Sequence, residues 1–135
     1  MRIDVITLFP DLFVPFQQQG VVRRAFDSGA VNLKLWQLRD FASGNYRRVD
    51  DRPFGGGPGM VMAAQPLTDA LSAIRADRAE PQAMQAPVVL FSPQGETITH
   101  ARVAAQAASS QGVILVCGRY EGIDQRFVDR FVDLQ

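Results

Sequence analysis

Two glycine-bounded turns in the second half of the sequence combine residue types that could hold a nucleotide-like ligand. The segments Ser92–Gly95 and Gly118–Gly122 each follow a short apolar run. Glycine allows a ligand to lie directly against the main chain. Tyr120 can pack on a ring or sugar, and Glu121 can accept hydrogen bonds from ribose hydroxyls or offset the charge of a cationic ligand. These residues favour a ligand site, and a plain turn with solvated charges is the alternative.

A third segment, Val49–Met60, is unusually rich in glycine. It holds four glycines within five positions. Ordering such a run costs much conformational entropy, so we expect it where a base, a phosphate or another backbone must come close. It matches neither a P-loop nor the G-x-G-x-x-G pattern. Arg47, Arg48 and Arg52 flank or occupy it and could supply salt-sensitive phosphate contacts. We expect an RNA-facing loop, with a flexible surface loop as the alternative.

Composition narrows the possible chemistry. Cys117 is the single cysteine and His100 the single histidine, so a disulfide within the chain and a cysteine metal cluster are excluded, and we expect no metal site. No apolar run approaches the roughly 20 residues of a membrane span, and we expect a cytoplasmic protein without membrane contact. Net charge is zero, yet residues 20–60 carry seven basic and four acidic side chains, which is weak evidence for a nucleic-acid partner.

The elements that must position these turns alternate between strands and helices. We expect strands over residues 2–8, 31–38, 88–91 and 112–117, and helices near 10–16, 21–27, 65–74, 99–110 and 123–132. Phe13 and Phe16 should face inward, Val88–Phe91 should be buried on both faces, and Arg75–Ala86 should be a polar surface connection. This order predicts one α/β domain with a mostly parallel sheet flanked by helices. Ligands of such sheets bind beyond the carboxyl ends of the strands, so both turns could face one pocket.

The motifs as a set closely resemble the bacterial tRNA (guanine-N1)-methyltransferase family. The matching stretches are residues 6–10, 39–41, 49–53, 55–60, 65–67, 92–95 and 117–124. The pairing of Asp-Asp-Arg-Pro and Gly-Gly-Gly-Pro-Gly-Met with a downstream Cys-Gly-Arg-Tyr-Glu-Gly-Ile-Asp is highly specific. The resemblance implies a SPOUT-type methyltransferase domain with a C-terminal trefoil knot, and a homodimer with active sites at the subunit interface.

The resemblance also assigns site residues. It implies S-adenosyl-L-methionine as cofactor, bound between two walls made of Leu90, Phe91, Ser92, Pro93 and Gln94 on one side and Gly118, Tyr120, Glu121 and Gly122 on the other. It implies that the tRNA anticodon stem-loop meets Arg24, Arg47, Arg48 and Arg52 together with Gly55, Gly56, Gly57, Pro58, Gly59 and Met60. Recognition of an unstacked base in a protein pocket suits such a loop.

The implied reaction transfers a methyl group to N1 of the guanosine 3′ of the anticodon, position 37. N1 must lose a proton, and in the family the base is an aspartate of a C-terminal domain, so no catalytic residue is assigned here. We expect residues 1–135 to be an incomplete S-adenosylmethionine-binding domain, truncated before the knot is complete, without the C-terminal tRNA-binding domain and inactive alone. The alternatives are a SPOUT methyltransferase acting on another RNA and a non-catalytic nucleotide- or RNA-binding α/β module.

Overall fold

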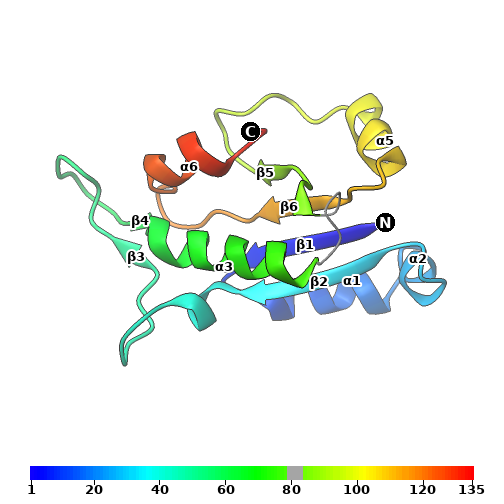
Figure 1. The fold of residues 1–135 in the computed structure, drawn as a ribbon, viewed down its shortest axis with the longest axis horizontal. Helices are drawn as coiled ribbons and strands as arrows, with labels where there is room; N and C mark the ends of the chain where they lie inside the picture. The colour runs from blue at the N-terminus through cyan, green and yellow to red at the C-terminus, as the bar shows by residue number, and fades with distance from the viewer. Residues whose placement is uncertain (79–83) are drawn as a thin grey trace.

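A four-stranded parallel sheet organises the protein, as seen in a computed structural model that describes residues 1–78 and 84–135 (Figure 1). The strands are β1 (Arg2–Thr7), β2 (Asn32–Gln37), β5 (Val88–Leu90) and β6 (Val113–Val116), and their order across the sheet is β2-β1-β6-β5. Each neighbouring pair is parallel, and the register aligns Leu90 with Val116. The predicted α/β architecture is confirmed, and the carboxyl ends of β5 and β6 are adjacent.

Helical segments connect these strands, as parallel pairing requires. They are the 3-10 helices η1 (Pro10–Phe13) and η2 (Leu38–Phe41) and the α-helices α1 (Val14–Gln18), α2 (Arg23–Asp27), α3 (Ala64–Asp77), α5 (His100–Ala108) and α6 (Gln125–Phe131). A separate two-stranded antiparallel sheet joins β3 (Asp50–Asp51) to β4 (Val61–Met62). Across the described ranges, no helix is long and apolar enough to cross a membrane.

The main core lies between one face of the sheet and the helices α3 and α6 (Figure 1). Leu67, Leu71 and Ile74 recur at helical spacing on α3 and are buried, as is Phe127 on α6. They pack in one cluster with the sheet residue Ile114. Full burial of such a side chain contributes roughly 1.5–3 kcal/mol, so this layer fixes the strands whose ends carry the site.

A buried ion pair joins the end of α3 to the sheet. Asp4 on β1 and Arg78 after α3 are both buried, with 2.8 Å between the Arg78 Nη2 and Asp4 Oδ2 atoms. Arg78 also donates to the carbonyls of Gln111 and Val113, and the Asp4 carboxylate also accepts from Arg2 and from the Trp36 indole. These partners belong to the sheet or to segments next to it, so the network holds α3 in register with the strands.

Three local predictions are wrong. Phe16 does not face inward but is 64% exposed on α1. The expected polar surface connection over 75–86 begins instead as part of the fold, because helix α3 continues to Asp77 and Arg78 is buried. Residues 79–83 of that segment lie outside the described ranges. The run 88–91 is not buried on both faces, because Phe91 is 47% exposed. In each case tertiary packing, which hydrophobicity along the chain does not encode, decides the outcome.

Candidate functional site

The two glycine-bounded turns lie at the same edge of the sheet, because each follows the carboxyl end of one of two neighbouring strands. The Phe91 amide donates to the Val116 carbonyl at 3.4 Å, which places the two strand ends side by side. A Cβ built on Gly118 would lie 3.9 Å from Cδ1 of Leu90 and 3.8 Å from Cδ1 of Ile123. Leu90 of the first expected wall and Gly118 of the second therefore meet, as the order of the sheet predicts.

The second turn presents its polar side chains to solvent. Tyr120 adopts a left-handed backbone conformation, with φ of 59°, which is uncommon for a residue other than glycine. Its hydroxyl donates to Oδ1 of Asp50 at 3.4 Å, and the neighbouring Glu121 is also exposed. Strained backbone of this kind persists where the surroundings impose it, and it clusters at ligand sites. The phenol and the carboxylate are available to a ligand at the strand ends.

Main-chain hydrogen bonds attach the glycine-rich loop to this second turn. The amides of Glu121 and Asp124 donate to the carbonyls of Met60 and Met62 at 3.0 and 2.9 Å, and the Met62 amide donates to the Gly122 carbonyl at 2.9 Å. The loop that begins at β3 and ends at β4 is therefore anchored beside the expected cofactor wall. No pattern along the chain indicated this contact, because it depends on pairing between residues 60 to 62 positions apart.

Three of the four arginines expected to contact RNA lie near this loop. Arg47, Arg48 and Arg52 are exposed on the segment around β3, and Arg47 pairs with Asp40 at 3.0 Å. Exposed pairs of this kind contribute little stability, so Arg47, like Arg48 in its pair with Asp51, can exchange a carboxylate for a phosphate at low cost. Arg24 lies on α2, at the opposite end of the molecule in Figure 1, and the described chain does not bring it to the loop.

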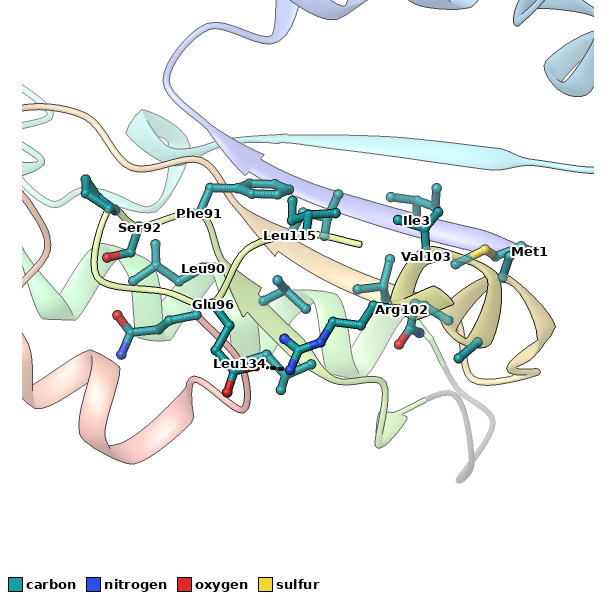
Figure 2. A pocket seen from close by; sticks show the side chains of 18 residues that line it. Met1, Ile3, Leu90, Phe91, Ser92, Glu96, Arg102, Val103, Leu115 and Leu134 are labelled. Carbon is teal, nitrogen blue, oxygen red and sulfur yellow. Dashed lines mark hydrogen bonds and ion pairs between the residues drawn. The ribbon is translucent and has the colours of Figure 1, made fainter. Parts of the chain in front are cut away.

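A cavity of about 940 Å³ lies beside the first turn, between the sheet and α5 (Figure 2). Leu90, Phe91, Ser92 and Pro93 line it, whereas the second-wall residues Gly118, Tyr120, Glu121 and Gly122 do not. Gln94 instead lines a smaller neighbouring cavity of about 280 Å³. The larger cavity is bounded mostly by aliphatic side chains of the sheet and of α5, among them Ile3, Leu115 and Val103.

The large cavity and the exposed polar side chains therefore indicate two different positions for a ligand, one beside α5 and one at the strand ends. An ion pair between Glu96 and Arg102 is the charged feature that Figure 2 shows in the larger cavity. A nucleoside needs convergent polar groups as well as apolar contact. The exposed Tyr120 and Glu121, with bare main chain at Gly118, supply them at the strand ends. The candidate site accordingly lies at the strand ends, with the cavity extending from its first wall.

The last residues of the chain border the first turn. The Leu90 amide donates to the Leu134 carbonyl and the Glu96 amide to the Gln135 carbonyl, both at 2.9 Å. Gly95 packs so closely on the Gln135 backbone that a Cβ there would overlap it. Residues 133–135 thus extend the sheet beyond β5, a contact that no pattern in the sequence indicated.

Two ionisable groups near the site have shifted pKa values. Burial raises the pKa of the Cys117 thiol, so this thiol stays protonated and is a poor nucleophile at neutral pH. The hydrogen bond from the Arg126 side chain lowers the pKa of Asp124, which also caps α6 by accepting from the Arg126 amide. Among residues 1–78 and 84–135, no group of three or more potential ligands gathers to hold a metal ion.

The chain is closely similar to several curated tRNA methyltransferases. A tRNA (guanine-N(1)-)-methyltransferase from Methylibium petroleiphilum is 65% identical over 98% of this chain, and one from Polaromonas sp. is 62% identical over 100% of it. In both cases the match covers 52% of the relative, so the chain spans about half the length of the curated relatives it matches.

Fold and sequence agree on the same family. A crystal structure of tRNA (m1G37) methyltransferase from Aquifex aeolicus superposes with a TM-score of 0.83 and 29% identity, over 99% of this chain and 57% of that one. The expected SPOUT-type α/β fold is thereby confirmed. The family profile described as tRNA (Guanine-1)-methyltransferase TrmD matches residues 1–135, the whole of the sequence. On these grounds the chain belongs to the tRNA (guanine-1)-methyltransferase family.

Proposed function

We propose that this chain provides the cofactor-binding half of a tRNA (guanosine(37)-N1)-methyltransferase that uses S-adenosyl-L-methionine. The observation that carries the proposal is the meeting of Leu90 and Gly118 at the adjacent ends of β5 and β6. Family membership and the names of the close relatives support the reaction and the tRNA substrate. We further propose a cytoplasmic homodimer, a trefoil knot that includes these strand ends, and a separate C-terminal tRNA-binding domain in the whole protein.

The residues at the strand ends suit an adenosyl group. Leu90 offers apolar contact, Gly118 carries no side chain of its own next to Leu90, and Tyr120 and Glu121 are exposed. Phe91, Ser92, Pro93 and Gln94 complete the first wall, and Gly122 completes the second. In this arrangement Glu121 accepts hydrogen bonds from ribose hydroxyls or balances the positive charge of the cofactor, and Tyr120 packs against its ring or sugar.

The chemistry needs alignment and the removal of a proton. When bound, S-adenosylmethionine supplies an electrophilic methyl group on a sulfonium. The protein contributes by holding the acceptor nitrogen in line with that methyl group, which removes much of the entropic barrier. Guanine N1 must also give its proton to a base, and we assign that base to no residue of this chain. The glycine-rich loop and its arginines orient the RNA.

Binding of the cofactor tests the placement of the pocket. We expect S-adenosylmethionine to shift the amide resonances of residues 90–92, 94 and 118–122 in NMR titrations of the whole protein. Gly118→Val fills the space between Leu90 and Ile123 and should weaken binding at least about tenfold. Ala76→Val, which adds bulk at an exposed position of α3, is the matched control and should bind normally. Normal binding by Gly118→Val would show that the pocket is elsewhere.

A second substitution tests the division of roles between cofactor and RNA. We expect Arg52→Ala to weaken binding of an anticodon stem-loop RNA and to lower the slope of log affinity against log salt by about one, because one phosphate contact is lost. Cofactor affinity should be unchanged. Arg130→Ala, an exposed arginine on α6, is the control. If Arg52→Ala lost both RNA affinity and cofactor affinity, the separation of the RNA-binding loop from the cofactor site would be contradicted. RNA binding by a protein that binds no cofactor would favour the non-catalytic RNA-binding module.

A further inference from the structure

The glycine-rich loop touches the expected cofactor wall through a side chain as well as through the main chain. If a Cβ were added to Gly59, it would overlap Cγ of Glu121 and lie 3.0 Å from its Cδ and 3.1 Å from its Oε1. The Glu121 side chain therefore lies directly against the backbone of Gly59. No other amino acid leaves this space free.

The other glycines of the loop are different. Gly55, Gly56 and Gly57 also have positive φ angles, yet a Cβ on any of them would meet nothing within 4 Å. Their backbone conformation explains why glycine is favourable there. Gly59 is subject to two constraints, a φ of 86° and the contact with Glu121. The second constraint concerns the cofactor wall and not the loop itself.

Two further contacts hold the same parts together. The Glu121 amide donates to the Met60 carbonyl, one residue beyond Gly59, so the backbone of Glu121 is fixed next to the loop. The Tyr120 hydroxyl reaches Asp50 on β3, at the other end of the loop. With its backbone fixed on one side, the Glu121 side chain can be displaced by a group at position 59 only by moving its carboxylate or by moving the loop.

We propose that Gly59 is a positioning residue for Glu121. By lacking a side chain it lets the Glu121 carboxylate lie against the loop, so that the cofactor wall and the RNA-facing loop take up their positions together. The inference rests on the proposed function, since that function gives Glu121 and the loop their ligands. A ligand that binds Glu121 then changes the loop, and by linkage RNA bound to the loop changes the cofactor affinity by the same factor.

NMR of the unliganded chain tests the contact by itself. We expect Gly59→Ala to shift the amide resonances of Glu121, Gly122 and Asp124 across the interface. The control is Gly56→Ala, whose φ of 85° matches that of Gly59 but whose Cβ enters open space. It should shift only resonances of the loop. Equal patterns in the two variants would overturn the proposal, because they would show that strain and not the Glu121 contact dominates.

A double substitution separates positioning from a general loss of structure. In the Glu121→Ala background the clashing Cγ is absent, so adding Gly59→Ala should produce no further shift at residues 118–124. A further shift as large as in the wild-type background would also overturn the proposal. This cycle uses the coupling between two neighbouring positions and is unaffected by losses common to both backgrounds.

Cofactor titration then separates the positioning role of Gly59 from the proposed function. In the whole protein, Gly59→Ala should weaken S-adenosylmethionine binding about tenfold, and Gly44→Ala, with a φ of 79° and open space, should change it less than about twofold. Unchanged affinity in Gly59→Ala would overturn the positioning role. Failure of the unsubstituted whole protein to bind would count against the proposed function, and the NMR comparison would still decide whether Gly59 positions Glu121.

Discussion

At the scale of single residues, the most constrained group of the fold is the buried carboxylate of Asp4. Its carboxylate receives hydrogen bonds from Arg78 at 2.9 Å and from the Trp36 indole at 2.8 Å. An isolated buried charge is costly, whereas a fully hydrogen-bonded one can be tolerated and makes the arrangement specific. The network lies within the sheet and at the end of α3, and it is separate from the exposed polar groups that we assign to ligand binding.

Removal of Arg78 should therefore destabilise the fold strongly. We expect Arg78→Ala to lower the free energy of unfolding in urea by about 3 kcal/mol, because it leaves Asp4 with fewer partners and frees two carbonyls. Lys34→Ala is the control, since Lys34 is 44% exposed where it pairs with Asp77. It should cost less than about 1 kcal/mol. Equal losses of unfolding free energy in the two variants would mean that burial does not determine how much these ion pairs stabilise the fold.

The sequence could not predict such pairs. Asp4 interrupts an apolar strand and Arg78 follows an amphipathic helix, but 74 positions separate them and nothing in their spacing relates one to the other. The same holds for Gly59 and Glu121, whose contact exists only in three dimensions. By contrast, residues that act through local spacing were predictable, such as Thr99, whose side chain accepts from the Arg102 amide at the start of α5.

At the scale of elements, periodicity and buried runs located the long helices and the four strands of the main sheet. The edge of the sheet at which the two turns meet followed from the rule for parallel strands. The two-residue strands β3 and β4 were not predicted, because they are too short to show alternation and exist through hydrogen bonds to each other and to residues 121–124. The placement of the glycine-rich loop was therefore beyond sequence reasoning, although its composition marked it as unusual.

Helix α6 offers a test at this scale, because Asp124 caps it. We expect Asp124→Ala to cost about 1 kcal/mol near neutral pH, measured by urea unfolding, and Asp124→Asn to cost less, since asparagine also caps well. The hydrogen bond from Arg126 lowers the Asp124 pKa in the folded chain. The charged contribution is therefore present above the pKa of the unfolded chain and is lost as the pH falls through the lower folded value, below about pH 4.

The asparagine variant isolates the part that depends on charge. It keeps the cap but cannot titrate, so its stability relative to the wild type should rise as the pH falls below about 4. A constant difference between Asp124→Asn and the wild type from pH 7 to pH 3 would contradict the role of ionisation. Equal stability of Asp124→Ala and the wild type at neutral pH would contradict the cap itself.

At the scale of the whole molecule, the two faces of the sheet are unequal. The face toward α3 and α6 is densely packed, whereas the other face includes the cavity beside α5 (Figures 1 and 2). Ile98 and Val103 line that cavity and are 61% and 53% exposed. The core and the candidate site thus share Leu90, which is buried in the core cluster and lies next to Gly118 at the strand ends, whereas the polar residues Tyr120 and Glu121 are exposed.

An apolar cavity of this size should bind an apolar dye in the folded chain. We expect anilinonaphthalene sulfonate fluorescence to rise on binding under native conditions, since exposed apolar patches attract such probes. Val103→Gln removes apolar surface from the cavity without adding charge and should weaken dye binding about fivefold, the equivalent of roughly 1 kcal/mol of apolar contact. Val21→Gln, which changes an exposed valine outside the cavity, should leave dye binding unchanged. If both variants lower the fluorescence equally, the dye reports general exposure, and the cavity is closed to apolar ligands in solution.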